Sequence, residues 1–309
     1  MSAIGPEIRA SIDIGSNSVL LLLAEYSPFK ELAKLSEVTG LGKGLDKSGM
    51  FAEGPLEETY NALKKYADVC QQHGLTPDKI IATATEASRV ARNAPAFYQR
   101  VREELGINVQ IITGKGEAAL TTKGILFNTQ FNEPEVVVMD IGGASTEFIR
   151  VDTQSYKIIE SVSLKVGAVR TADWLKEGSF DSALGKIFSD HSAELDRYQT
   201  RLLQCVAGTL TSLGNMHLGN KDFVEDEVHG MTLKASDIDV LYQRCGMWTP
   251  EQFVREFPFL GKRSDAIRGG LMLTTHLLKR LKVESVVIST YGLRYGTFLE
   301  GKVPHEYLA

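Results

Sequence analysis

Short apolar runs alternate with amphipathic segments along the whole chain, and this alternation is typical of an α/β protein. Apolar runs at residues 9–14 and 19–25, joined by a four-residue turn, predict a β-hairpin. An apolar stripe with three- and four-residue spacing begins near Pro55 and ends at Gly74, which predicts a helix. The same patterns predict strands at residues 79–84 and 109–113 and helices at residues 95–105 and 116–127.

After a polar connector at residues 128–134 the pattern restarts, which indicates an internal repeat. We therefore predict two domains, residues 1–125 with 297–309 and residues 126–296. The second half is expected to contain helices at residues 181–203, 236–244, 249–256 and 264–281, strands before Val206 and at residues 285–290, and a helix from Leu293 to Leu299 that returns the chain to the first domain. One offset aligns Asp13, Ile14, Gly15 and Ser18 with Asp140, Ile141, Gly142 and Ser145.

Composition and charge exclude several classes of protein. The chain has 34 Lys and Arg against 39 Asp and Glu, so its net charge of −5 argues against nucleic acid as a partner. No apolar run reaches the roughly 20 residues of a membrane span, and the chain does not start like a signal peptide, so we expect a cytoplasmic protein. Cys70, Cys205 and Cys245 lie far apart, which favours core positions over disulfides or zinc ligands.

Each half contains a strand, an aspartate and a glycine-rich turn in succession. Such turns expose backbone N–H groups, and these groups bind phosphate oxygens. The aspartate would repel a phosphate, so its natural partner is a hard cation that bridges to one. An ordinary hairpin with an Asx turn is the alternative, but two copies at corresponding points favour a phosphate site.

Nine motifs occur in the order expected of the exopolyphosphatase and guanosine pentaphosphate phosphohydrolase (Ppx/GppA) family, and they extend over nearly the whole chain. They are "DIGSNSVLLLL", "GLGKGLDKSG", "TEASRVARN", "ITGKGEAALTTKG", "DIGGASTEF", "VGAVR", "AGT", "KRSDAIRGG" and "STYGLRYG". The chain thus resembles the short, two-domain type of this family. The resemblance implies two ribonuclease-H-like domains of the actin-like ATPase superfamily that flank a phosphate-binding cleft.

The resemblance also implies catalytic roles for two side chains. Glu117 would be the general base that activates water, although a first-turn Glu is also favoured by the helix dipole. Arg89 would neutralise charge on the transferring phosphoryl group, or lie on a helix surface. Gly116 stands where the family usually carries a second acid.

By the same resemblance, three acids would hold Mg²⁺ (magnesium) and several turn residues would bind phosphate. Glu147 could instead be a surface acid, Thr209 a plain N-cap, and Lys262, Arg263 and Arg268 either a path for a polyanion or a solvated helix start. Ala144 replaces the third glycine of the family's second turn. The predicted metal ligands are Asp13, Asp140 and Glu147, and the predicted phosphate-binding residues are Gly15, Ser16, Asn17, Ser18, Gly142, Gly143, Ala144, Ser145, Gly208 and Thr209.

We therefore expect an exopolyphosphatase-like hydrolase whose partner is a polyanionic phosphate substrate. Hydrolysis of guanosine pentaphosphate (pppGpp) is the alternative, because it breaks the same kind of bond. A phosphotransferase of the same superfamily and a nucleotide-dependent scaffold are more remote. The length of the short type leads us to expect distributive cleavage that favours short polyphosphate. A homodimer is a possible assembly.

Overall fold

The computed structural model describes residues 7–309, which form two compact units. The first unit contains the described residues up to Phe127 together with Leu293–Ala309, and the second contains Asn128–Gly292. The sequence placed the domain boundaries after residues 125 and 296. Each unit is built on a mixed β-sheet with helices, which confirms the predicted α/β class.

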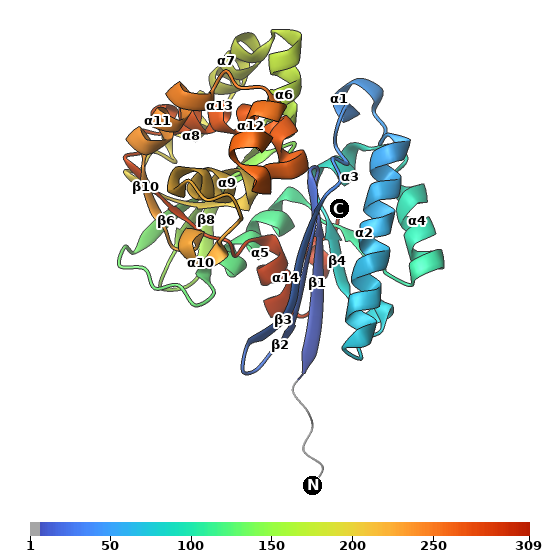
Figure 1. Ribbon diagram of the computed structural model, residues 1–309. Coiled ribbons are helices and arrows are strands. Elements are labelled where there is room, and N and C mark those ends of the chain that lie inside the picture. Colours follow the sequence, from blue (N-terminus) through green and yellow to red (C-terminus); the bar gives the residue numbers. More distant parts are fainter. Residues whose placement is uncertain (1–6) are drawn as a thin grey trace. The chain divides into compact units, whose positions relative to one another are not determined.

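The sheet of the first unit has five strands in the order β3-β2-β1-β4-β5. Strands β1 to β3 form an antiparallel meander, and β4 and β5 run parallel to β1. Helices α2 and α4 lie against one face of this sheet, and α5 and α14 lie against the other (Figure 1). Because both faces are covered, β2 is apolar along most of its length, whereas β1 alternates apolar residues with Arg9, Ser11 and Asp13. The strands are β1 (Ile8–Ile14), β2 (Ser18–Glu25), β3 (Lys30–Val38), β4 (Ile81–Ala84) and β5 (Val109–Ile111).

The last helix of the chain packs closely on α5 within this first unit. A Cβ atom at Gly296 would lie 1.7 Å from the carbonyl oxygen of Leu120, so only glycine permits this approach. The hydroxyl of Ser11 donates to the carbonyl oxygen of Arg294 at 2.7 Å and fixes the helix to β1. The helices of this unit are α1 (Leu45–Ser48), α2 (Glu53–Gln72), α3 (Glu86–Val90), α4 (Ala94–Leu105), α5 (Gly114–Leu126) and α14 (Leu293–Glu300), with 3₁₀ turns at Pro77–Lys79 and His305–Tyr307.

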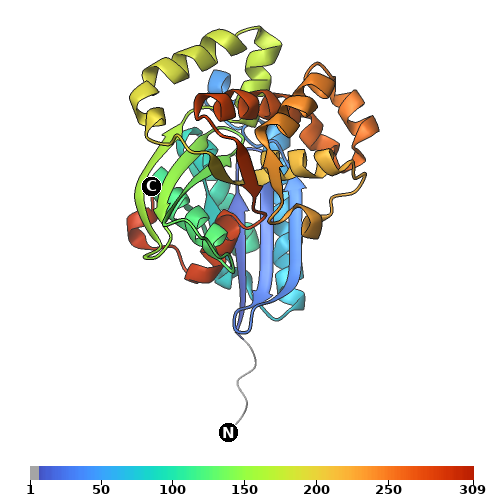
Figure 2. The same cartoon turned by 90° about the vertical axis from the view of Figure 1, so that its left-hand side faces the viewer.

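The sheet of the second unit has six strands in the order β10-β11-β9-β6-β7-β8. Strands β6 to β8 form an antiparallel meander, drawn in green in Figure 2, and β9 and β11 run parallel to β6. Without the edge strand β10, this order and these directions repeat those of the first unit, which confirms the internal repeat. The strands are β6 (Glu135–Ile141), β7 (Thr146–Asp152), β8 (Lys157–Leu164), β9 (Leu202–Val206), β10 (Thr232–Lys234) and β11 (Ser285–Ile288).

One long helix predicted for the second unit is wrong. The segment from Asp181 to Leu203 divides into α7, α8 and the start of β9. Strand β9 lies between β6 and β11, so its apolar side chains are buried on both faces and carry no period that separates them from a buried helix. The helices of this unit are α6 (Ala168–Glu177), α7 (Phe180–Asp190), α8 (Ser192–Asp196), α9 (Ala207–Leu218), α10 (Glu225–Val228), α11 (Ala235–Cys245), α12 (Pro250–Glu256) and α13 (Ser264–Arg280), with a 3₁₀ segment at Pro258–Arg263.

All three cysteines are free and buried, as the sequence predicted. Burial raises the pKa of the Cys70 thiol to about 12, so this thiol stays protonated and packs as a small apolar side chain. Within residues 7–309, no helix has both the length and the hydropathy needed to cross a bilayer.

Candidate active site

The two glycine-rich turns have the same backbone geometry. In the first unit, the N–H of Gly15 donates to the carbonyl oxygen of Ser18 at 3.0 Å. In the second, the N–H of Gly142 donates to the carbonyl oxygen of Ser145, also at 3.0 Å. Each bond closes the tip of a hairpin at the carboxyl end of the central strand, where α/β sheets commonly bind ligands.

A loop after β3 supports the first turn. The N–H of Gly42 donates to the carbonyl oxygen of Ser16 at 2.7 Å. The N–H groups of Thr39 and Gly40 both donate to the backbone carbonyl oxygen of Asn17 at 3.0 Å. A Cβ atom at Gly42 would lie 2.9 Å from the Cβ of Ser16, so the loop approaches the turn closely. This contact gives a structural role to the "GLGKGLDKSG" motif, to which the sequence assigned none.

The start of α6 supports the second turn in an equivalent way. Its N–H groups at Ala168 and Val169 donate to the carbonyl oxygens of Gly142 and Gly143, both at 2.9 Å. The guanidinium of Arg170 donates from Nη1 to the carbonyl oxygen of Ala144 at 2.6 Å. These bonds hold the turn through its carbonyl oxygens. Sequence reasoning quoted the "VGAVR" motif and missed this role of its arginine.

Asp13 lies at the end of β1, and one of its carboxylate oxygens is left without a partner. Oδ1 is buried and accepts no hydrogen bond from any described residue. Burial raises the pKa of Asp13 from 3.8 to about 7, although the positive charge of Arg294 opposes this rise. An orphaned, buried carboxylate oxygen fits a hard cation as its missing partner.

In the second unit, Asp140 and Glu147 lie directly opposite each other on β6 and β7. Opposed residues point to the same face of a sheet, and two like charges there repel each other. Glu147 is buried, and its Oε1 accepts a hydrogen bond of 2.7 Å from the hydroxyl of Ser163. A cation between the two acids would relieve the repulsion. Among residues 7–309, however, no group of three or more acidic, His or Cys side chains gathers as a metal site would, so the magnesium ion stays a prediction.

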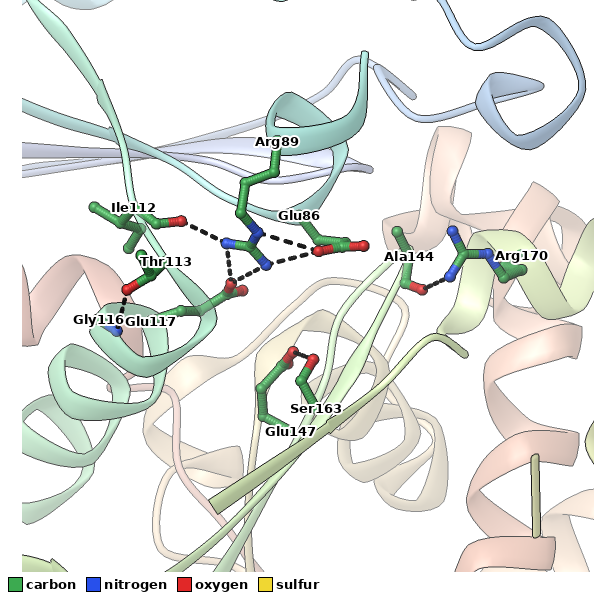
Figure 3. A network of polar contacts seen from close by, with 10 residues as sticks. All are labelled: Glu86, Arg89, Ile112, Thr113, Gly116, Glu117, Ala144, Glu147, Ser163 and Arg170. Carbon is green, nitrogen blue, oxygen red and sulfur yellow. Dashed lines mark hydrogen bonds and ion pairs between the residues drawn. The ribbon is translucent and has the colours of Figure 1, made fainter. Parts of the chain in front are cut away.

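The predicted catalytic pair does come together in the first unit. Glu117 lies in the first turn of α5, and its Oε2 accepts hydrogen bonds from Nη1 and Nη2 of Arg89, each of 3.1 Å (Figure 3). Arg89 comes from α3, which follows β4, just as α5 follows β5. Because β4 and β5 are parallel, their carboxyl ends bring these helix starts to one edge of the sheet. The Glu117 carboxylate is thereby buried and held in place.

A third charged group belongs to this cluster, and the sequence analysis missed it. Glu86 accepts from Nε and Nη2 of Arg89 at 3.1 and 2.8 Å, and the carbonyl oxygen of Ile112 accepts from Nη1 at 2.6 Å. The signal was present in "TEASR", where an acid stands three residues before an arginine on one helix.

Gly116 departs from the family pattern for a steric reason. A Cβ atom there would lie 2.6 Å from the Cβ of Tyr307, which no real contact allows. Tyr307 is held at this place because its carbonyl oxygen accepts the backbone N–H of Thr113 at 2.8 Å. The hydroxyl of Thr113 caps α5 by accepting the N–H of Gly116 at 3.1 Å. The end of the chain therefore occupies the space that a larger side chain would need.

Gly208 and Thr209 lie in the first turn of α9, next to the guanidinium of Arg263. A Cβ atom at Gly208 would lie 3.0 Å from Nη1 of Arg263, so the guanidinium covers this helix start. The N-cap position belongs to Val206, which rules out the alternative that Thr209 is the cap. Arg268 instead donates from Nε to the carbonyl oxygen of Gly246 at 2.8 Å. Only Arg263 of the two arginines thus contacts the predicted phosphate-binding segment.

Comparison with known proteins gives a family match along most of the chain. The model of the Ppx/GppA phosphatase family matches residues 23–304. A bifunctional 3-dehydroquinate synthase/phosphatase of Fusobacterium nucleatum is 28% identical over 95% of this chain and 46% of its own length. The chain therefore spans about half the length of that relative. The protein named Exopolyphosphatase 2 in Mycobacterium tuberculosis is 24% identical over 94% of this chain and 97% of its own length.

Solved structures of similar proteins have the same fold. The Ppx/GppA family member of Aquifex aeolicus superposes with a TM-score of 0.75 and 27% identity over 95% of this chain and 97% of that chain. An exopolyphosphatase of Cytophaga hutchinsonii superposes with a TM-score of 0.85 and 23% identity, over 96% of this chain and 99% of that chain. The second likeness concerns the fold alone.

Proposed function

Because this chain belongs to the Ppx/GppA phosphatase family, we propose that it releases orthophosphate from the end of inorganic polyphosphate. The observation that carries this proposal is the buried Glu117 carboxylate, which Arg89 holds at the carboxyl end of two parallel strands. Hydrolysis of a phosphoric anhydride needs an oriented water and a group that takes its proton, and a fixed carboxylate supplies both. The relative named Exopolyphosphatase 2 in Mycobacterium tuberculosis supports the choice of substrate.

In the proposed mechanism the two glycine-rich turns bind phosphate and Glu117 activates water. The N–H groups of Gly15 and Gly142 close the two hairpins, so the remaining N–H groups of the two glycine-rich turns would bind phosphate oxygens of the substrate. Glu117 accepts a proton from the attacking water as the water approaches phosphorus. A magnesium ion, for which the sequence predicts Asp13, Asp140 and Glu147 as ligands, would supply positive charge that shields the phosphate oxygens.

Hydrolysis of guanosine pentaphosphate is the second candidate. The resemblance found in the sequence implies either activity, and both reactions remove a terminal phosphate. The contacts proposed above involve only terminal phosphates, so the two substrates differ in the group that lies beyond them. Orthophosphate release from short polyphosphate, long polyphosphate, guanosine pentaphosphate and ATP, measured with Mg²⁺, decides between the candidates.

Replacing Glu117 by Gln tests the proposed chemistry. The amide can still orient water but cannot take its proton, so turnover should fall by about 10²–10⁴-fold while KM changes little. If Glu117 only stabilises the fold, through the helix dipole and its ion pair with Arg89, the loss is instead one of stability, larger than the roughly 0.3–1 kcal/mol of the dipole alone, with turnover intact. Turnover and thermal midpoint measured on one preparation separate these outcomes, and a destabilised but active variant refutes the proposal. Glu104→Gln, which alters an exposed ion pair with Arg100 on α4, is the matched control.

A further inference from the structure

All five N–H donors of Arg89 are engaged by protein acceptors. Its side face, formed by Nε and Nη2, donates to Oε2 of Glu86 at 3.1 and 2.8 Å. Its end face, formed by Nη1 and Nη2, donates to Oε2 of Glu117 at 3.1 Å twice. The remaining N–H on Nη1 donates to the carbonyl oxygen of Ile112 at 2.6 Å. A guanidinium has five such hydrogens, so none is left for a phosphoryl oxygen in this geometry.

The cluster is well shielded from water. The side chains of Arg89, Glu86 and Glu117 are 15%, 13% and 10% exposed. Two carboxylates against one guanidinium give a net charge of −1. A guanidinium so placed offers a substrate little free positive charge, but it can hold a carboxylate in one orientation, because its planar fork fixes direction as well as distance.

We propose that Glu86 is a positioning residue for the reaction: it locks the guanidinium of Arg89, and Arg89 in turn fixes the reactive carboxylate of Glu117. This inference rests on the proposed role of Glu117 as the base. It assigns Arg89 to the orientation of the base instead of a direct contact with the transferring phosphoryl group.

Glu86 suits this task because of its place in the chain. Glu86 and Arg89 lie three residues apart on the short helix α3, so their side chains meet on one face. An arginine has a long, flexible stem, and two anchors are needed to stop its fork from turning about the bond to Nε. Ile112 provides one anchor at Nη1, and Glu86 provides the other at the opposite side of the fork. Without Glu86, Glu117 would keep its partner but lose the fixed direction of that partner.

Two substitutions at Glu86 separate geometry from charge. Glu86→Asp keeps the charge but draws the carboxylate back by one methylene, so turnover should fall by up to about 10²-fold, the usual cost of a shift of 1 Å in a catalytic group. Glu86→Gln keeps an oxygen that can accept from both Nε and Nη2, so its turnover should fall less than about tenfold. KM should change less than about twofold in both. Glu104→Asp, which shortens a surface partner of Arg100, is the control and should match the wild type.

Repeating the Glu86 substitution in the Glu117→Gln variant tests whether Glu86 acts through Glu117. In Glu117→Gln, Glu86→Asp should lower the residual turnover by less than about twofold, because a positioning residue loses its effect when its target is already disabled. An equal loss in both backgrounds, wild-type turnover in Glu86→Asp, or a raised KM with unchanged turnover overturns the inference. If Glu117→Gln loses turnover as expected while Glu86→Asp does not, only the role of Glu86 fails. If the wild type releases no orthophosphate from any substrate, the proposed function fails and this inference with it.

Discussion

Replacing Asp13 by Asn should stabilise the protein in the absence of divalent ions, although it removes a predicted metal ligand. The reason is the buried, unpartnered Oδ1 at the end of β1. Burial raises the pKa of Asp13 to about 7, so the folded state favours the neutral acid. Asn has nearly the same shape and no charge, and it therefore avoids the cost of burying an ionised carboxylate.

The size of the effect follows from the pKa shift, and its sign from proton linkage. A carboxyl group whose folded pKa is raised from 3.8 to about 7 contributes its full stability below pH 3.8 and loses it as the pH rises through about 7. One pKa unit corresponds to 1.36 kcal/mol, so a shift of about 3 units amounts to about 4 kcal/mol. Asp13→Asn should accordingly raise the free energy of unfolding by about 4 kcal/mol at pH 9, and by almost nothing at pH 3.5.

Urea denaturation at several pH values, with EDTA present, measures this difference. Added Mg²⁺ should stabilise the wild type at pH 8 and should stabilise Asp13→Asn less, because a ligand stabilises only the state that binds it. Asp78→Asn is a suitable control: Asp78 is exposed, and a hydrogen bond with the Thr76 side chain lowers its pKa, so its variant should not gain stability. Equal pH dependence of the wild type and Asp13→Asn would show that the carboxylate is satisfied in solution, and would refute the reasoning.

Other substitutions test the second turn and the end of the chain. Asp140→Asn should lower turnover by at least about 10²-fold and weaken its dependence on Mg²⁺, with a thermal midpoint no lower than that of the wild type because repulsion with Glu147 is relieved; unaltered Mg²⁺ dependence would contradict the metal role. Gly116→Ala should cost about 1–3 kcal/mol in stability because its methyl group collides with Tyr307, and a thermal midpoint equal to that of the wild type would disagree with the packing. Arg170→Met should destabilise the second unit by about 1–3 kcal/mol and raise KM, because the carbonyl oxygen of Ala144 loses its donor; kinetics with an unchanged KM would exclude a link to binding.

Local pattern predicted the elements that carry a clear apolar period and missed strands at three of the four sheet edges, whereas the edge strand β5 was predicted. The stripe from Pro55 to Gly74 corresponds to α2, and the runs around the first turn correspond to β1 and β2. The sequence analysis did not find β3 and β8, the edge strands of the two meanders. Both contain lysine and glutamate, which are depleted in strands and which protect exposed edges from pairing with other chains.

The sequence predicted the parts of the candidate site that occur in both halves of the chain. It did not predict the parts that depend on packing between distant residues. Asp13 and Asp140 were aligned by one offset, and the hairpins place them at equivalent positions. By contrast, the contact between Gly116 and Tyr307 joins residues nearly 200 positions apart, and no local pattern contains it. Glu86 lies between these cases, because its spacing to Arg89 was visible in the sequence, whereas the other partner of Arg89, Glu117, is brought there by the sheet.

The two hairpins have the same backbone pairing but carry different charges, and this difference extends over three strands. Asp140, Glu147 and Ser163 lie in one row across β6, β7 and β8, and the same offset places Asp13, Leu20 and Ser36 in the equivalent row across β1, β2 and β3. Leucine thus stands in the first unit where the second has its buried glutamate. The second row offers a cation two carboxylates, one of them oriented by a serine hydroxyl, whereas the first offers one carboxylate whose burial already favours the neutral form. On these grounds we expect the second unit to attract a cation more strongly than the first, because burial of Asp13 already favours its neutral form.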